Sequence, residues 1–264
     1  MNTSINTLYP GTWDIISGYR GSISHGMYVP KNEPNCIDDK DTMHVCVPPI
    51  DYYLGTKQYG SRGTKEIAEG EWDIVVYEFK KYISLLAKGN PNVISLLWLD
   101  ETMYLKRTTE GHLLISERDI FNSKQIYHSF IGYSYGQLHR MTHMAFRGYM
   151  GEKRKSLVEK FGYDTKNAAH LIRLMCMCIE FLNEHKFYVL RHDNQQLLEI
   201  KRGEWDLEKV KEEADRLFKR AEVAYDKCSL PSQADEELIN KLSIKILQDR
   251  LRFYETCIRG ELWA

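Results

Sequence analysis

Three short stretches of the 264-residue sequence hold side chains suited to phosphate chemistry, and two of them lie close together. Gly21-Ser22 follows a β-rich run, and such a turn directs backbone N–H groups and a hydroxyl outward, where they can hold phosphate oxygens. Asp39 and Asp41 lie two residues apart at the head of the predicted strand Thr42–Val47, so both carboxylates should project from one side of the sheet. Two like charges this close repel unless a cation lies between them, and hard oxygen ligands favour Mg²⁺ or Mn²⁺. The pair therefore predicts a divalent-metal site, with a solvated acidic turn as the alternative.

A third carboxylate is available on the next predicted strand, Trp72–Glu78. Asp73 lies at its start and Glu78 at its end. We prefer Asp73 as the partner of the acidic pair because it lies at the start of the strand. If the two strands were antiparallel, however, either end could face the pair.

The predicted secondary structure around these stretches changes along the chain. Residues 10–100 mix β-rich runs, among them Trp13–Tyr19, with Gly, Pro and Asn punctuation. From about residue 117 the pattern is helical, with predicted helices over 163–187, 206–226 and Asp235–Tyr254. We therefore expect a front unit over residues 1–116 and a helical unit over residues 117–264. Asp206 is the expected N-cap of the second of these helices.

The helix predicted over 163–187 has two distinct faces. At about 100° per residue, Lys166, His170 and Arg173 fall on one narrow face. Apolar side chains fall on the opposite face: Ala168, Leu171, Ile172, Met175 and Ile179. The pattern predicts a helix that buries one side, presents a cationic stripe on the other and takes Asp164 as its N-cap. The stripe is either a solvated face or a contact surface for phosphate.

A weaker stripe consists of Tyr133, Gln137 and Arg140, again on one helical face. Its aromatic and hydrogen-bonding groups suit contact with a base or ribose, and core packing is the alternative in a chain with 17 tyrosines. Further forward, Gly89 is expected to end one helix and Pro91 to open the next.

The order Gly-Ser, acid-x-acid and a third acid between apolar residues resembles the DNA polymerase β-type nucleotidyltransferase superfamily. Over roughly residues 13–205 the chain looks more specifically like the predicted nucleotidyltransferase family associated with RNA repair. That similarity is carried by the segments GSISHGMYVPKNEPNCIDDKD, DIVVYEFKKYISLLAKGNPNVISLLW and YDTKNAAHLIRL. It implies an α+β fold, with a small mixed, palm-like sheet and its helices in residues 1–116 and an α-helical C-terminal half.

The resemblance also implies a two-metal mechanism. Asp39 and Asp41 would bind two divalent ions, Mg²⁺ or Mn²⁺, and Asp73 would complete the site and help to deprotonate the attacking hydroxyl. The gap between Ser22 and Asp39 is longer than in many superfamily members, which leaves Asp38 as a second candidate for the first ligand. We favour Asp39, because it shares the strand parity of Asp41.

Nucleotide contacts are expected from the Gly-Ser loop and the two helical stripes. The residues are Gly21, Ser22, His25, Tyr133, Gln137, Lys166, His170 and Arg173. Within this set His25 either touches phosphate or packs behind the loop. The other members would hold the triphosphate, the ribose and base, or an acceptor phosphate.

The expected activity is the transfer of a nucleoside monophosphate from an NTP to an RNA end, with tRNA among the candidate acceptors. Nucleotidylation of a protein or a small-molecule hydroxyl is the alternative, and a catalytically silent nucleotide- or RNA-binding module is a third. The complete set of three acids argues against the silent module.

Composition limits the partners and the compartment. Residues 1–110 hold 11 basic and 14 acidic residues, and residues 111–264 hold 25 basic and 23 acidic residues. Because neither part has a large excess of positive charge, any basic surface that binds nucleic acid must be local. No apolar run approaches the ~20 residues of a membrane span, and no secretory signal pattern opens the sequence. None of the six cysteines forms a CxxC pair. These features predict a cytoplasmic protein with reduced thiols and no membrane partner.

Overall fold

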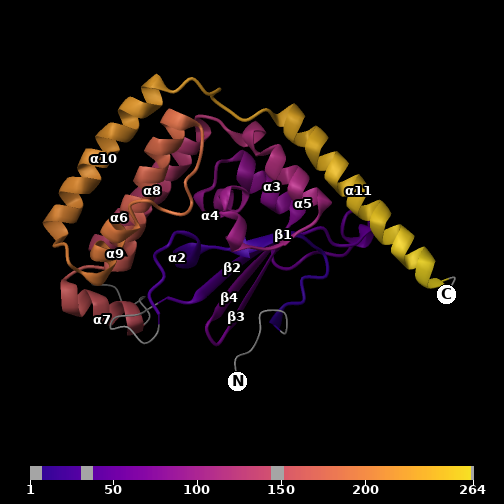
Figure 1. Ribbon diagram of the computed structural model, residues 1–264, viewed down its shortest axis with the longest axis horizontal. Helices are drawn as coiled ribbons and strands as arrows, with labels where there is room; N and C mark the ends of the chain where they lie inside the picture. The colour runs from indigo at the N-terminus through magenta and orange to yellow at the C-terminus, as the bar shows by residue number, and fades with distance from the viewer. Residues whose placement is uncertain (1–7, 31–37, 144–151, 263–264) are drawn as a thin grey trace.

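The computed structural model describes residues 8–30, 38–143 and 152–262, and it contains a five-stranded sheet with most helices gathered on one side (Figure 1). The strands lie in the order β3-β4-β2-β1-β5. Their bounds are β1 Asp14–Tyr19, β2 Lys40–Cys46, β3 Thr64–Glu69, β4 Trp72–Glu78 and β5 Tyr104–Arg107. Strands β2 and β4 are parallel and the other neighbours are antiparallel. This mixed sheet with its helices confirms the expected α+β class.

The parallel pairing of β2 with β4 decides which acidic side chains meet. In its register Asp41 lies directly beside Asp73, and register partners on neighbouring strands project to the same face. Glu78 lies at the opposite end of β4. Its carboxylate accepts hydrogen bonds from two N–H groups in the first turn of α3 (Phe79–Ala87) and so caps that helix. The antiparallel arrangement that would bring Glu78 to the acidic pair is therefore wrong.

Two strands were not predicted, and both lie at the edges of the sheet. Strand β3 reads Thr-Lys-Glu-Ile-Ala-Glu, with every side chain exposed or half-buried, so it lacks the apolar alternation that marks a strand. It joins β4 through a tight turn in which Gly70 has a φ of +64°. Strand β5 has only four residues. Edge strands of this kind are held by backbone pairing, which leaves little signal in the side chains.

The helical part of the chain begins after β5. Its helices are α5 Thr109–Ser116, α6 Gln125–His143, α7 Glu152–Phe161, α8 Thr165–Glu184, α9 Asn194–Arg202, α10 Leu207–Lys227 and α11 Glu236–Leu262. The carboxylates of Asp164 and Asp206 accept from the N–H groups of Asn167 and Lys209, at 3.0 and 2.8 Å, which confirms both predicted N-caps. None of the helices in the described part of the chain combines the length and the hydrophobicity that crossing a membrane requires.

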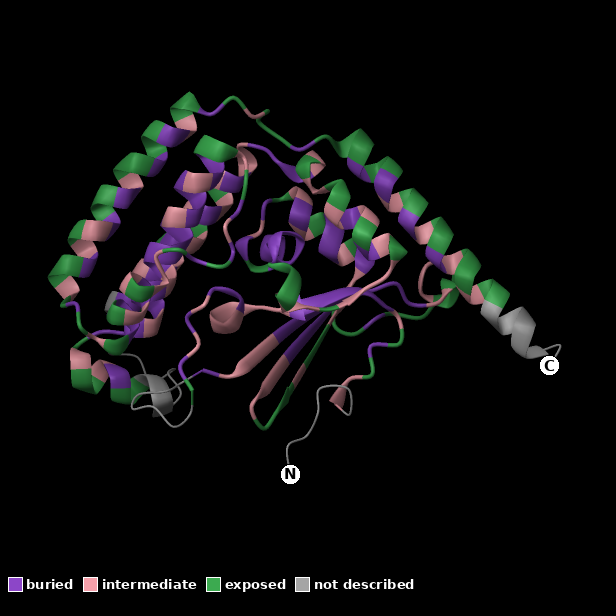
Figure 2. Ribbon diagram, in the orientation of Figure 1, coloured by how far each residue is buried: buried purple, intermediate pink, exposed green. Residues whose placement is uncertain are grey.

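Helix α8 lies at the centre of the helical layer, packed against α6, α9 and α10, while α11 crosses the outside of α3 and α5 (Figure 1). The predicted apolar face of α8 is buried, as expected. The largest hydrophobic cluster joins the sheet to these helices and takes residues from both sides of residue 116, from Ile15 on β1 to Phe181 on α8 and Ile246 on α11. Buried residues accordingly line the inner faces of the helices and the top of the sheet (Figure 2).

Near the sheet, α3 ends at Ala87 and Gly89 takes a φ of +63°. A short helix, α4 (Pro91–Ile94), then begins with Pro91 at its first position. The side chain of Asn90 accepts from the N–H of Asn92 at 2.9 Å and caps α4. The predicted helix end at Gly89 and start at Pro91 are both confirmed.

Candidate active site

The loop between β1 and the single-turn helix α2 (Gly21–Ser24) lies directly against β2. Gly21 has a φ of +62°, and a Cβ atom there would lie 2.4 Å from Oδ2 of Asp41. The N–H of Arg20 donates to the backbone oxygen of Asp41 at 3.0 Å. Glycine is therefore required at position 21 for two reasons, the left-handed backbone and the space that the carboxylate occupies.

Ser22 supplies the one loop hydroxyl that the sequence predicted to hold phosphate. Its Oγ is buried, and it has no hydrogen-bond partner among the described residues. A buried hydroxyl without a partner costs free energy, so such a group indicates a ligand or a water molecule at that position. Ser24, by contrast, is satisfied locally, because its hydroxyl donates to the carbonyl of Gly21 at 3.0 Å.

The carboxylates of Asp39, Asp41 and Asp73 lie close enough to repel one another. The pKa of Asp41 is raised to about 6, mainly by burial and further by the neighbouring charges of Asp73 and Asp39, against the opposing effect of Arg20 and Lys166. Arg20 Nη2 lies 4.0 Å from Oδ2 of Asp73, whose side chain is 45% exposed. Carboxylates that repel one another in this way are suited to a divalent cation, which would remove the repulsion.

The described residues do not form a preformed metal-binding site. Nowhere among them do three His, Cys, Asp or Glu side chains converge closely enough to hold an ion. Asp41 and Asp73 are paired across β2 and β4, and Asp39 lies just before β2 and acts on Asp41 through its charge. Two adjacent carboxylates with a third close by fit a hard cation in chemistry, and the third would have to approach on binding.

Asp38 has a different setting from Asp39. Its side chain is fully buried, forms an ion pair with Nζ of Lys201 on α9, and accepts from the N–H of Val29 at 2.9 Å. The ammonium of Lys201 also donates to the carbonyl of Met27 at 2.8 Å. Asp38 thus connects α9 to the segment that follows α2. Asp39, by contrast, is half-buried and lies directly before β2.

The three side chains predicted on one face of α8 lie over this loop, with Arg173 buried and Lys166 and His170 half-buried. Lys166, His170 and Arg173 line the same cavity as Gly21 and Asp41. Lys166 is half-buried and its Nζ lies 3.5 Å from Asp38. Arg173 is buried, and no carboxylate among the described residues forms an ion pair with it; its Nη1 lies 3.1 Å from the sulfur of Met177. Burial, with a contribution from Arg191, lowers the pKa of this guanidinium to about 9.

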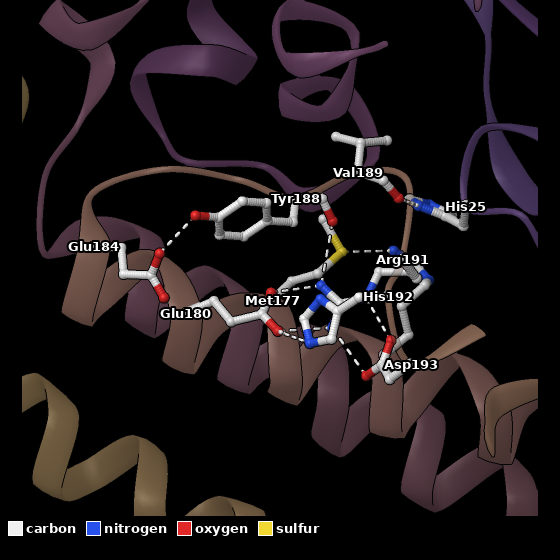
Figure 3. Close-up of polar contacts among 10 residues, drawn as sticks. His25, Met177, Glu180, Glu184, Tyr188, Val189, Arg191, His192 and Asp193 are labelled. Carbon is white, nitrogen blue, oxygen red and sulfur yellow. Dashed lines mark hydrogen bonds and ion pairs between the residues drawn. The ribbon is translucent and has the colours of Figure 1, made fainter. Parts of the chain in front are cut away.

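His25 is buried behind the loop, with its ring directed at the carbonyl of Val189 (Figure 3). Nδ1 lies 2.8 Å from that oxygen, and because a carbonyl only accepts, Nδ1 carries the hydrogen. Burial, together with the nearby charge of Arg173, holds the pKa of His25 well below its usual value. The neutral ring therefore exposes an acceptor nitrogen, Nε2, which suits a hydroxyl or a guanidinium and not a phosphate oxygen.

The segment that positions His25 was not singled out in the sequence. Arg191, fully buried, donates to Glu180 at 2.5 and 2.8 Å and to Asp193 at 2.8 and 2.9 Å, and both pairs are bidentate (Figure 3). Its backbone N–H donates to the carbonyl of His25 at 3.4 Å. These ion pairs and hydrogen bonds hold the irregular stretch 186–193 between α8 and α9. The sequence signal is weak, because Arg191 has no helical or strand periodicity around it.

These groups line two adjoining cavities. The first, about 350 Å³ and here called the central cavity, is lined by Arg20, Gly21, His25, Asp41, Glu66, Tyr77, Pro91, Asn92, Ser95, His170 and Arg173. The second, about 170 Å³ and here called the side cavity, shares five of these residues and adds Ser22, Met27, Lys166, Ala169 and Lys201. The loop and β2 form one wall and α8 forms the opposite wall. Of the three predicted metal ligands, Asp41 lines both cavities, whereas Asp39 and Asp73 line neither, and Arg173 and His170 lie on the opposite wall.

The second predicted stripe is only partly at the pocket. The hydroxyl of Tyr133 on α6 accepts from the side-chain amides of Asn90 and Asn92, at 3.0 and 3.3 Å, and Tyr133 lines a neighbouring cavity. Gln137, one turn further along α6, is buried. Its Oε1 has no hydrogen-bond partner in the described part of the chain, and it lines neither the central nor the side cavity.

Two comparisons with known proteins bear on this site. A search of curated proteins found no match. A family model matches residues 19–245, a span that begins just before the Gly-Ser loop and includes the acidic strands, α8 and α10. Because the match covers most of the chain and all of the pocket described above, the protein belongs to the RNA repair pathway DNA polymerase beta family, RlaP, and is a polymerase β-like nucleotidyltransferase.

Proposed function

We propose that this enzyme uses a divalent cation to transfer a nucleoside monophosphate from an NTP to a hydroxyl at the end of an RNA, with tRNA among the candidate acceptors. The observation that carries the proposal is the opposition of Asp41 and Arg173 across the central cavity. Burial and the charges of Asp73 and Asp39 raise the pKa of this carboxylate, and the guanidinium is buried with no carboxylate partner among the described residues. A metal-bound triphosphate would bring a cation to the carboxylate and an anion to the guanidinium.

The triphosphate would lie between the β1–α2 loop and α8. Ser22 would donate its buried hydroxyl to a phosphate oxygen, and Lys166 and Arg173 would donate from the opposite side. Gly21 lets the loop backbone approach the phosphates closely. The neutral His25 would orient Arg173 or accept from a ribose hydroxyl through Nε2.

Asp39, Asp41 and Asp73 are the residues that would hold Mg²⁺ or Mn²⁺. When bound, such an ion stabilises negative charge on the phosphates and lowers the pKa of a coordinated hydroxyl. In the transfer, the acceptor oxygen forms a bond to the α-phosphorus, and the bond from that phosphorus to pyrophosphate breaks. Asp73, whose side chain is 45% exposed, would take the proton of the incoming hydroxyl.

The acceptor is tested by incubating the protein with α-labelled NTPs and Mg²⁺ or Mn²⁺, and with either total tRNA or lysate protein. We expect label in RNA, with release of pyrophosphate. Label in protein alone would assign the enzyme to protein nucleotidylation. Metal-dependent NTP binding with no label in any acceptor would indicate a silent binding module.

A further inference from the structure

We propose that a basic, tyrosine-rich groove beside the active site binds the 3′ end of a single-stranded RNA acceptor; this inference rests on the nucleotidyltransferase function proposed above. The groove, here called the acceptor track, runs along β3 and β4 away from Asp73. It consists of residues 52–66, the first turn of α3 and the Asn90–Asn92 segment. The family match names no residue for this role.

The track begins at the catalytic pocket itself. A third cavity of about 490 Å³ is lined by Arg62, Lys81, Asn90, Tyr133 and neighbouring residues, and it shares Glu66, Tyr77 and Asn92 with the central cavity. Its lining includes two cations, two side-chain amides and two tyrosines, which suits a sugar-phosphate chain and bases. An RNA strand in this cavity would enter the central cavity, which Asp41 lines.

The track continues beyond Arg62 into a fourth cavity of about 380 Å³. This cavity is lined by Tyr52, Tyr53, Lys57, Gln58, Tyr59, Arg62, Gly63, Glu78 and Lys80. Lysine ammonium groups of this cavity lie over tyrosine rings, with Lys80 5.1 Å from the centre of Tyr53 and Lys57 5.9 Å from that of Tyr52. Cations interleaved with aromatic rings are typical of surfaces that bind single-stranded nucleic acid.

Charge along the track is opposite to that of the surrounding chain. Residues 52–66 and 79–82 together hold five Lys and Arg residues against one acidic residue, Glu66, although residues 1–110 as a whole carry an excess of acid. The length also fits, because β4 from Asp73 to Glu78 spans about 16 Å. That distance accommodates on the order of three to five nucleotides of a stacked strand.

Arg62 lies at the junction of the third and fourth cavities in a backbone conformation that favours glycine. Its φ is +53°, between Gly60 at +52° and Gly63 at +82°, and its side chain is exposed. A residue with a Cβ atom is strained in this conformation relative to glycine. The position therefore carries a cation at the expense of stability, and a phosphate in the track gives that cation a function.

Glu66 determines which part of the RNA reaches the pocket. It lines both the central and the third cavity, where a carboxylate would repel a phosphate group. The terminal ribose, whose hydroxyls donate hydrogen bonds, fits beside it. The track therefore selects an RNA that ends in a free 3′-hydroxyl and disfavours one that ends in a 3′-phosphate.

The test uses Arg62→Gly and Lys80→Ala in the full chain, with Arg220→Ala, an exposed cation on α10, as the matched control. Binding of a fluorescent single-stranded RNA with a 3′-hydroxyl is followed by anisotropy over a range of salt. Each track variant should weaken binding several-fold and reduce the salt-dependence slope by about one, while the KM for NTP stays unchanged. Arg62→Gly should also keep or raise the Tm, because glycine relaxes the backbone.

The outcomes separate the track from the reaction. Unchanged RNA affinity in both track variants would overturn the track, even if RNA were labelled in the transfer assay. Loss of RNA affinity with no transfer to any acceptor would support the track and refute the proposed function. A wild-type protein that labels lysate protein and does not bind the oligonucleotide would overturn both.

Discussion

Asp41 on β2 and Asp73 on β4 are direct register partners across two parallel strands, and their carboxylates project to the helix-covered face of the sheet. The relationship depends on backbone hydrogen bonds along both strands and not on any side-chain contact. Each carboxylate can therefore be replaced by an amide of the same shape without disturbing the strand register.

The first prediction concerns that pair. Asp41→Asn and Asp73→Asn should each lower nucleotidyl transfer by about a thousandfold or more, because each removes charge needed to hold the cation at the reacting phosphate. The rate is measured with α-labelled NTP at saturating metal. Glu69→Gln is the matched control, since Glu69 is an exposed carboxylate on β3 at the same end of the sheet. Full activity of either Asp variant would refute the catalytic assignment.

The second prediction is a pH dependence of stability in the metal-free protein. Burial and neighbouring acids raise the pKa of Asp41 from 3.8 to about 6, so the folded state keeps a proton that the unfolded state releases between about pH 4 and 6. The contribution of Asp41 to stability therefore falls as the pH rises through this window and stays low above it. Asp41→Asn should be more stable than the wild type in urea unfolding, by a larger margin at pH 7 than at pH 4.5.

Metal supplies the control for that experiment. Mg²⁺ should raise the Tm of the wild type at pH 7 and have a much smaller effect on Asp41→Asn, because the ion offsets the repulsion only where the carboxylate is present. An equal shift in both proteins would place the ion elsewhere.

The third prediction separates backbone strain from crowding at glycine. Gly21 and Gly70 have nearly equal φ, +62° and +64°, but a Cβ atom meets Asp41 at 2.4 Å in the first case and nothing within 4 Å in the second. Gly70→Ala should cost about 1–2 kcal/mol of unfolding free energy and leave transfer intact. Gly21→Ala should cost more and abolish transfer, because it displaces Asp41. Equal activity of the two variants would contradict the close-approach argument.

The fourth prediction assigns Asp38 a role in folding. Asp38→Asn leaves the ammonium of Lys201 buried without its counter-charge and should cost about 3–5 kcal/mol in urea unfolding. The double variant Asp38→Asn, Lys201→Met should recover a large part of this loss and transfer nucleotides at a rate near that of the wild type. A double variant that is stable and inactive would instead make Asp38 a metal ligand.

The fifth prediction concerns Arg173, which is buried without a carboxylate partner in the described structure. Arg173→Met removes a desolvated charge, so the free energy of unfolding should stay constant or rise. The KM for NTP should rise about ten- to a hundredfold, as expected for the loss of a charged hydrogen bond to phosphate. A fall in stability with an unchanged KM would show that the guanidinium is structural.

Local patterns in the sequence determined much of the fold. Runs rich in β-forming residues predicted β1, β2 and β4, and each of these strands has a continuous stretch of buried residues. The 3.6-residue period predicted α8 and α10, and the Asp residues before them predicted their caps. Strands β3 and β5 could not be predicted, because β3 has no buried side chain, β5 has only four residues, and each is held by backbone pairing with a single neighbouring strand.

The candidate site divides in the same way. Sequence patterns predict which residues carry the chemistry: the Gly-Ser loop, the spaced acids and the cations on one face of α8. The three-dimensional fold was needed to show that β2 and β4 are parallel, which pairs Asp41 with Asp73, and that Arg173 is buried over the loop. It also placed Asp38 in an ion pair and His25 behind the loop. These outcomes depend on strand register and on contacts between residues more than a hundred positions apart, which no local pattern contains.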